Sequence, residues 1–157
     1  MVWVKRFLIF ALISFVVMQF FRVDKNIAEG DYVQAFVDDT NPPDEVMIIL
    51  KTACNDCHSN NTTYPWYAEV APVSYWLDDH IRDGKKHLNF SAWDSYSVKK
   101  KDHKMEELEE MVAEGEMPLD SYTWVHKDAV LSDQQRDAMV AWVKQYRAML
   151  ALGDRPQ

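Results

Sequence analysis

The chain has 157 residues, of which 17 are basic and 25 acidic, and 48% are hydrophobic, so it fits one domain with enough apolar content for a core. Its first 25 residues contain four basic side chains and one acidic side chain, which leaves 13 basic and 24 acidic residues, a net charge of −11, for the remainder. So acidic a domain is not expected to bind nucleic acid, and a charged protein partner should present a basic docking surface.

Residues 1–25 are expected to be a membrane anchor. A lysine-arginine pair precedes fifteen residues, Phe7 to Phe21, that are apolar apart from Ser14 and Gln19. This run fits the core of a secretory signal, and with residues 2–4 it approaches the ~20 residues that span a bilayer. It ends in bulky and then charged residues, not in the small residues of a cleavage site. We therefore expect an uncleaved N-terminal transmembrane helix.

Residues 26–43 are predicted to be a connector, followed by a folded domain over residues 44–152. Pro42 and Pro43 at the end of the connector suit the approach to a helix. The two acidic residues that follow favour the first turn of that helix, because negative charge is stabilised there. The helix has an apolar face and runs into the first cysteine of the chain. Its apolar residues are Val46, Met47, Ile49 and Leu50.

Three further helices are predicted from apolar residues at helical spacing. The last helix begins with a capping box formed by Ser132 and Gln135. Glycines are expected to end the other two. The predicted ranges are Pro72 to Arg82, stopped near Gly84, then Ser97 to Glu114, ended by Gly115, and a last helix that continues to Leu150.

The segment 85–96 between two of these helices is expected to be a loop that turns Leu88, Phe90 and Trp93 inward. Alternation typical of a strand occurs only in the short stretch from Tyr32 to Val37. The predicted fold class is therefore all-α.

The strongest signal in the chain is Cys54-Asn55-Asp56-Cys57-His58. Two cysteines that stand three residues apart can turn both thiols toward one plane and reach the two vinyl groups of one porphyrin. His58 can bring an imidazole nitrogen to the iron from the same side. We therefore expect one haem c, attached covalently through Cys54 and Cys57, with His58 as an axial iron ligand.

Other interpretations of the cysteine pair are weaker. A disulfide oxidoreductase site needs a strand before the cysteines, whereas residues 48–53 resemble the end of a helix. A structural zinc site normally shows a second close pair of ligands. The remaining histidines form no such pair: they are His80, His87, His103 and His126.

Met117 is the predicted second axial ligand. It lies between the end of a predicted helix at Gly115 and Pro118, which restrains the backbone of the loop. A methionine opposite a histidine raises the reduction potential, as an electron carrier requires. His126 and His87 are the alternatives and would give a bis-histidine haem of lower potential.

A resemblance to a known family rests on the haem motif and the aromatic segment that follows it. The residues that carry it are CNDCHSNNTTYPWYAEVAPVSYWLDDHIRDGKKHLNFS, then GEMPL, Tyr122, His126 and a last helix that reaches Trp142. This sequence resembles the haem-binding domain family of membrane-anchored monohaem c-type cytochromes over about Val46 to Trp142. The resemblance implies a cytochrome c-like helical fold with haem on Cys54 and Cys57 and with His58 as axial ligand.

Together these features predict a membrane-anchored electron carrier rather than an enzyme. Because c-type thioethers are formed outside the cytoplasm, the haem domain is expected to face the periplasm from the inner membrane. Two alternatives remain. A peroxidase-like haem enzyme would need an open distal position and acid–base groups, for which His87, His126 and Glu116 are candidates. A haem-based ligand sensor would need an iron position that a small molecule can occupy.

Overall fold

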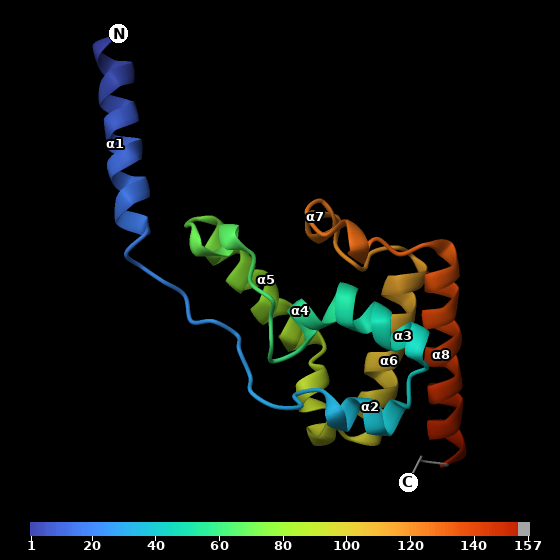
Figure 1. The fold of residues 1–157 in the computed structure, drawn as a ribbon. Helices are drawn as coiled ribbons and strands as arrows, with labels where there is room; N and C mark the ends of the chain where they lie inside the picture. The colour runs from blue at the N-terminus through green and yellow to red at the C-terminus, as the bar shows by residue number, and fades with distance from the viewer. Residues whose placement is uncertain (154–157) are drawn as a thin grey trace.

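The computed structural model describes residues 1–153, and every regular element among them is helical (Figure 1). The predicted all-α fold class is confirmed. The α-helices are α1 (Val2–Met18), α2 (Gln34–Thr40), α3 (Asp44–Ile49), α4 (Asn55–His58), α5 (Val73–His87), α6 (Val98–Ala113), α7 (Asp120–Thr123) and α8 (Asp133–Leu152). A π-helix, η1 (Leu50–Cys54), and three 3₁₀ helices, η2 (Trp66–Glu69), η3 (Phe90–Ser95) and η4 (Lys127–Ala129), lie between them.

Helix α1 stands apart from the other helices, and none of its residues is buried (Figure 1). It has 17 residues and ends before the apolar run does, and directly after it the Gln19 side chain donates to the carbonyls of Phe15 at 2.8 Å and Ala71 at 3.1 Å. Among the helices of residues 1–153, none combines the length and the hydropathy needed to cross a membrane. The predicted transmembrane helix is therefore not supported.

The segment that leads to the motif is helical almost without a break, from α3 through η1 to α4. Pro43 precedes α3 in an extended conformation, and Asp44 and Glu45 occupy its first turn, as the sequence predicts. Val46 and Ile49 are each only 1% exposed. Burial of this face fixes the helical segment in the domain and so fixes the motif at its end.

Helix α5 is longer than predicted, because Gly84 does not end it. The prediction of a stop at this glycine is wrong, and the reason is packing. A Cβ atom on residue 84 would lie 2.7 Å from the carbonyl oxygen of Cys57 and 3.2 Å from its Cβ. Gly84 therefore allows α5 to pack closely on α4, at the second cysteine of the motif.

Helices α6 and α8 pack antiparallel and close the domain on one side (Figure 1). Arg147, late in α8, pairs with Asp102 at 2.9 Å and Glu106 at 2.8 Å, early in α6. Arg136, early in α8, donates to the carbonyl of Val112, late in α6, at 3.2 Å. The predicted capping box at the start of α8 is confirmed.

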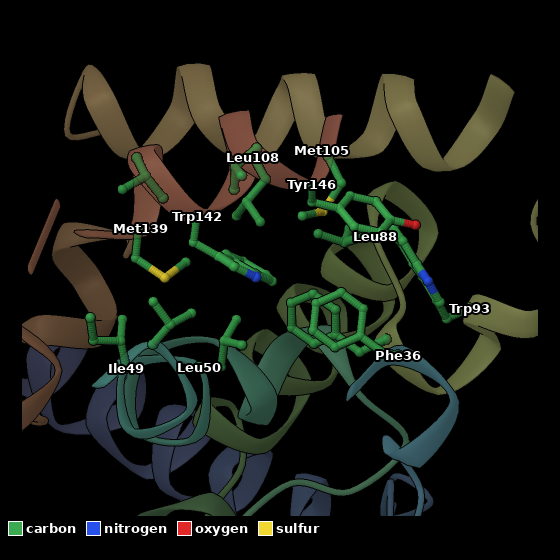
Figure 2. Packing of buried hydrophobic residues seen from close by; sticks show 14 of the residues in the cluster. Phe36, Ile49, Leu50, Leu88, Trp93, Met105, Leu108, Met139, Trp142 and Tyr146 are labelled. Carbon is green, nitrogen blue, oxygen red and sulfur yellow. The ribbon is translucent and has the colours of Figure 1, made fainter. Parts of the chain in front are cut away.

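The core combines residues of α2, α3 and η3 with residues of α6 and α8, and Figure 2 shows its packing. Phe36 of α2 contacts Phe90, Trp93 and Trp142, with ring centroids 4.4, 5.0 and 6.0 Å apart. The predicted inward positions of Leu88, Phe90 and Trp93 are confirmed, since all three are buried. Phe36 belongs to the predicted connector, so the connector supplies a helix and a core residue to the domain.

Candidate functional site

The two cysteines of the motif are free and partly buried where η1 passes into α4. Burial raises the pKa of the Cys54 thiol to about 12, with a further contribution from Cys57. Burial and the neighbouring Asp56 raise the pKa of the Cys57 thiol to about 11. Because thiol–disulfide exchange needs a thiolate, protonated thiols of this kind do not suit a disulfide oxidoreductase.

His58 ends α4, and its ring is held by the backbone on one side. Its Nδ1 lies 3.0 Å from the carbonyl oxygen of Leu88, directly after α5. A carbonyl only accepts hydrogen bonds, so Nδ1 carries the proton and Nε2 of the neutral ring keeps a free lone pair. Burial lowers the pKa of His58 despite this hydrogen bond, which favours the neutral form that binds iron.

The donor set of the motif fits haem c. It consists of two protonated thiols and one neutral imidazole whose Nε2 is available to a metal. A hydrogen bond from the other ring nitrogen to a carbonyl is the usual way in which proteins orient a ligating histidine. Within residues 1–153, no group of three or more His, Cys, Asp or Glu side chains is placed to hold a metal ion.

Asp56, between the two cysteines, connects the motif to α7. Its Oδ2 accepts a hydrogen bond from the hydroxyl of Tyr122 at 2.8 Å, and its Oδ1 accepts one from the backbone N–H of Thr63 at 2.9 Å. Burial raises the pKa of Tyr122, and the Asp56 carboxylate raises it further, so the hydroxyl remains a donor. The loop after the motif and α7 are both fixed to the same carboxylate.

Met117 lies in the short connection between α6 and α7 and is half-buried. Its backbone N–H donates to the carbonyl of Met111 at 3.1 Å. It precedes Tyr122 by only five residues, so the bond from Tyr122 to Asp56 keeps this segment near the motif. Its role as an iron ligand stays a prediction.

The two alternative histidines have different surroundings. His126 stacks on the ring of Tyr122, with centroids 4.0 Å apart and planes 14° apart, and its Nδ1 donates to the Tyr122 carbonyl at 3.1 Å. His87 lies at the end of α5 with its side chain 65% exposed, 3.8 Å from Asp83. Of the two, only His126 stacks on a residue that is hydrogen-bonded to the motif, because the Tyr122 hydroxyl donates to Asp56.

Three features of the site were not predicted from the sequence, and only one of them has a signal in the sequence. The Leu88 carbonyl is a backbone group, and nothing in the sequence indicates which backbone group faces a histidine. Gly84 has the residue type of a helix stop but serves a close helix contact. Asp56 was available as a signal, because it is the one charged residue between the two cysteines.

The sequence model of a family described as haem-binding domain matches residues 13–145. The matched range contains the motif, Met117, Tyr122 and His126. No curated protein and no solved structure matches the chain.

Proposed function

Because this chain belongs to the haem-binding domain family, we propose that it is a monohaem c-type cytochrome that transfers one electron at a time. Haem binding follows from the family. The covalent link through Cys54 and Cys57 is our proposal. The observation that carries it is the geometry of the motif, in which two free thiols lie beside an imidazole whose Nδ1 is bonded to Leu88.

The chain's own residues have separate tasks in this proposal. Bound haem supplies a one-electron couple at its iron. His58 would hold the haem iron through Nε2, and the Leu88 carbonyl holds the ring in place and increases its basicity. Met117 would hold the iron through its thioether, a ligand that favours the reduced state. If His58 and Met117 both bind the iron, electron transfer would be favoured over peroxidase chemistry, which needs an open iron position.

We further propose that the domain works on the periplasmic side of the inner membrane, attached there by its N-terminal apolar segment. Helix α1 supports this, because most of its large apolar side chains are exposed and none of its residues is buried. The redox partner should carry a basic docking surface, since the chain after residue 25 has 24 acidic and 13 basic residues.

Optical spectroscopy of the haem-loaded full chain tests this function. We expect reversible one-electron oxidation and reduction, with little binding of carbon monoxide to the reduced protein because both axial positions are occupied. Rapid carbon monoxide binding would favour a ligand sensor. Steady-state turnover of peroxide would favour an enzyme. Either result would contradict an electron carrier with a closed iron site.

A further inference from the structure

The segment Met18–Asn26, which we call the exit segment, is hydrogen-bonded to the haem domain. The side-chain amide of Gln19 both accepts from the N–H of Ala71 at 3.0 Å and donates to its carbonyl at 3.1 Å. The hydroxyl of Tyr75 contacts the carbonyls of Met18 at 2.9 Å and Phe21 at 2.6 Å. The end of α1 is therefore joined to the start of α5 by specific bonds.

Asn26 completes the attachment at the other end of the exit segment. Its side-chain N–H₂ donates to the carbonyl of Ser59 and to Oγ1 of Thr62, both at 2.9 Å. Its Oδ1 accepts from the ammonium of Lys85 at 2.6 Å, and its backbone N–H and carbonyl bond to Tyr64 and Thr62. Ser59 and Thr62 are buried and directly follow the haem motif, so the exit segment and the motif loop form one unit.

Ion pairs add little to this attachment. Arg22 lies 2.8 Å from Glu69, and Lys25 pairs with the same carboxylate, but all three side chains are more than 40% exposed. Exposed pairs of this kind contribute less than about 1 kcal/mol each. The hydrogen bonds of Gln19 and Asn26 are therefore the main connection.

Large apolar side chains are exposed on η2 and α5, the two elements that line a pocket together with the exit segment. Trp66 of η2 is 80% exposed, and Trp76 of α5 is 49% exposed. Between them in the sequence, Ala68 and Ala71 line a small pocket together with Met18 and Phe21. Figure 1 shows the start of α5 beside the lower end of α1. We call Trp66, Val73 and Trp76 the tryptophan surface.

We propose that the tryptophan surface lies in the headgroup region of the membrane to which α1 binds. This inference rests on the proposed membrane attachment and adds an orientation to it. Three observations carry it. The elements that carry the tryptophan surface, η2 and α5, line a pocket with the end of an apolar helix in which no residue is buried. The exit segment fixes that helix to the domain. Tryptophan is also the side chain that prefers the boundary between lipid and water.

Photo-crosslinking of the full chain to lipid tests the orientation. Trp66 is replaced by the photoreactive amino acid benzoylphenylalanine, and the protein is incorporated into phosphatidylcholine vesicles. Leu152 provides a matched control, because it is 79% exposed and lies at the end of α8 far from α1 (Figure 1). We expect about fivefold or more lipid adduct at position 66 than at position 152 after illumination.

Each outcome has a distinct meaning. If the chain does not sediment with the vesicles, membrane attachment fails, and the orientation fails with it. If the chain sediments but position 66 forms no more lipid adduct than position 152, only the orientation is wrong. An adduct between position 66 and another protein would also overturn the orientation, because the tryptophan surface would then be a protein interface.

A second variant tests the exit segment itself. In the double substitution Gln19→Ala and Tyr75→Phe, α1 is unchanged but the bonds that join it to α5 are removed. We expect unchanged sedimentation with vesicles and unchanged helix content, with lipid adducts at position 66 reduced by about half or more. Full retention of the adducts would show that the bonds of Gln19 and Tyr75 do not set the orientation.

Discussion

The bond between His58 and the Leu88 carbonyl is the most informative single contact in the molecule. It fixes the tautomer of the ring and leaves Nε2 free. Both partners are held by packing, since Leu88 is 7% exposed and His58 ends a helix against which α5 lies closely. The orientation of the His58 ring is therefore set by the fold of the chain itself.

The distal ligand is testable through Met117→Ala. If Met117 binds the iron, its truncation should lower the reduction potential by about 0.1–0.3 V, because the thioether stabilises the reduced state. A redox titration of the haem-loaded protein measures this. Met111→Ala is a matched control, since Met111 is exposed on α6 and only its carbonyl bonds to the Met117 N–H. An unchanged potential in Met117→Ala would indicate a histidine such as His126 or His87.

The contact between Tyr122 and Asp56 should contribute to stability. Tyr122→Phe removes the hydroxyl that donates to the Asp56 carboxylate at 2.8 Å. The carboxylate then keeps only its hydrogen bond from the Thr63 N–H. We expect a loss of about 1–3 kcal/mol in the free energy of unfolding, measured with urea. Tyr32→Phe serves as the control, because Tyr32 is half-buried and its hydroxyl has no hydrogen bond within residues 1–153. Equal effects of the two substitutions would argue against a specific role for this contact.

At the scale of elements, the close packing of α5 on α4 depends on Gly84. Gly84→Ala would gain about 1 kcal/mol in helix propensity. It would also place a methyl group 2.7 Å from the Cys57 carbonyl and force the two helices apart. We expect the second effect to dominate, with a net loss of about 1–3 kcal/mol and reduced haem content.

Thermal unfolding of Gly84→Ala and an assay of haem content check this prediction. Lys86→Ala, at an exposed position in the same helix, should change neither value appreciably. A Gly84→Ala protein with a higher melting temperature and full haem content would show that the contact is not tight.

Asp39 joins four elements through one carboxylate oxygen. Its Oδ2 accepts from Trp93 Nε1 of η3 at 2.8 Å, Lys101 Nζ of α6 at 2.7 Å and the Tyr146 hydroxyl of α8 at 2.7 Å. Burial alone would raise the pKa of Asp39, but the hydrogen bonds from Lys101, Tyr146 and Trp93 outweigh it and hold the pKa below its ordinary value. The carboxylate therefore stabilises the fold most when it is ionised.

The sign of the pH dependence follows from this lowered pKa. The stabilisation by Asp39 is fully present above the unfolded value of 3.8 and is lost as the pH falls through the lower folded value. Asp39→Asn should cost about 1–3 kcal/mol at neutral pH and should weaken the loss of stability below about pH 4. Urea unfolding across pH measures both effects. The exposed neighbour Asp38→Asn is the control, and identical pH curves for the two variants would contradict the prediction.

Sequence patterns predicted the elements that depend on local signals. The capping box of Ser132 and Gln135 and the acidic first turn at Asp44 are local, so both helix starts were correct. The extent of α5 was not predictable, because Gly84 matters through a contact with α4 that lies 27 residues away along the chain. The helix at Phe36 was missed for a similar reason, since its burial depends on aromatic rings from η3 and α8.

At the scale of the whole molecule, the site combines distant parts of the chain. The motif, the end of α5 and Tyr122 of α7 meet around α4. The sequence predicted the motif because its spacing is itself the chemical requirement. It could not predict that the exit segment after α1 bonds to the loop after His58, because Asn26 acts there through backbone and side-chain groups that follow no pattern.

The central claim is that one haem is attached to Cys54 and Cys57, and the intact mass of the denatured chain tests it most directly. The full chain is produced with a c-type maturation system, unfolded and analysed by mass spectrometry together with its absorption spectrum. The account predicts a mass that exceeds the amino-acid mass by one haem, with colour that stays on the unfolded chain. A mass equal to that of the amino acids alone, with all colour released on unfolding, would contradict it.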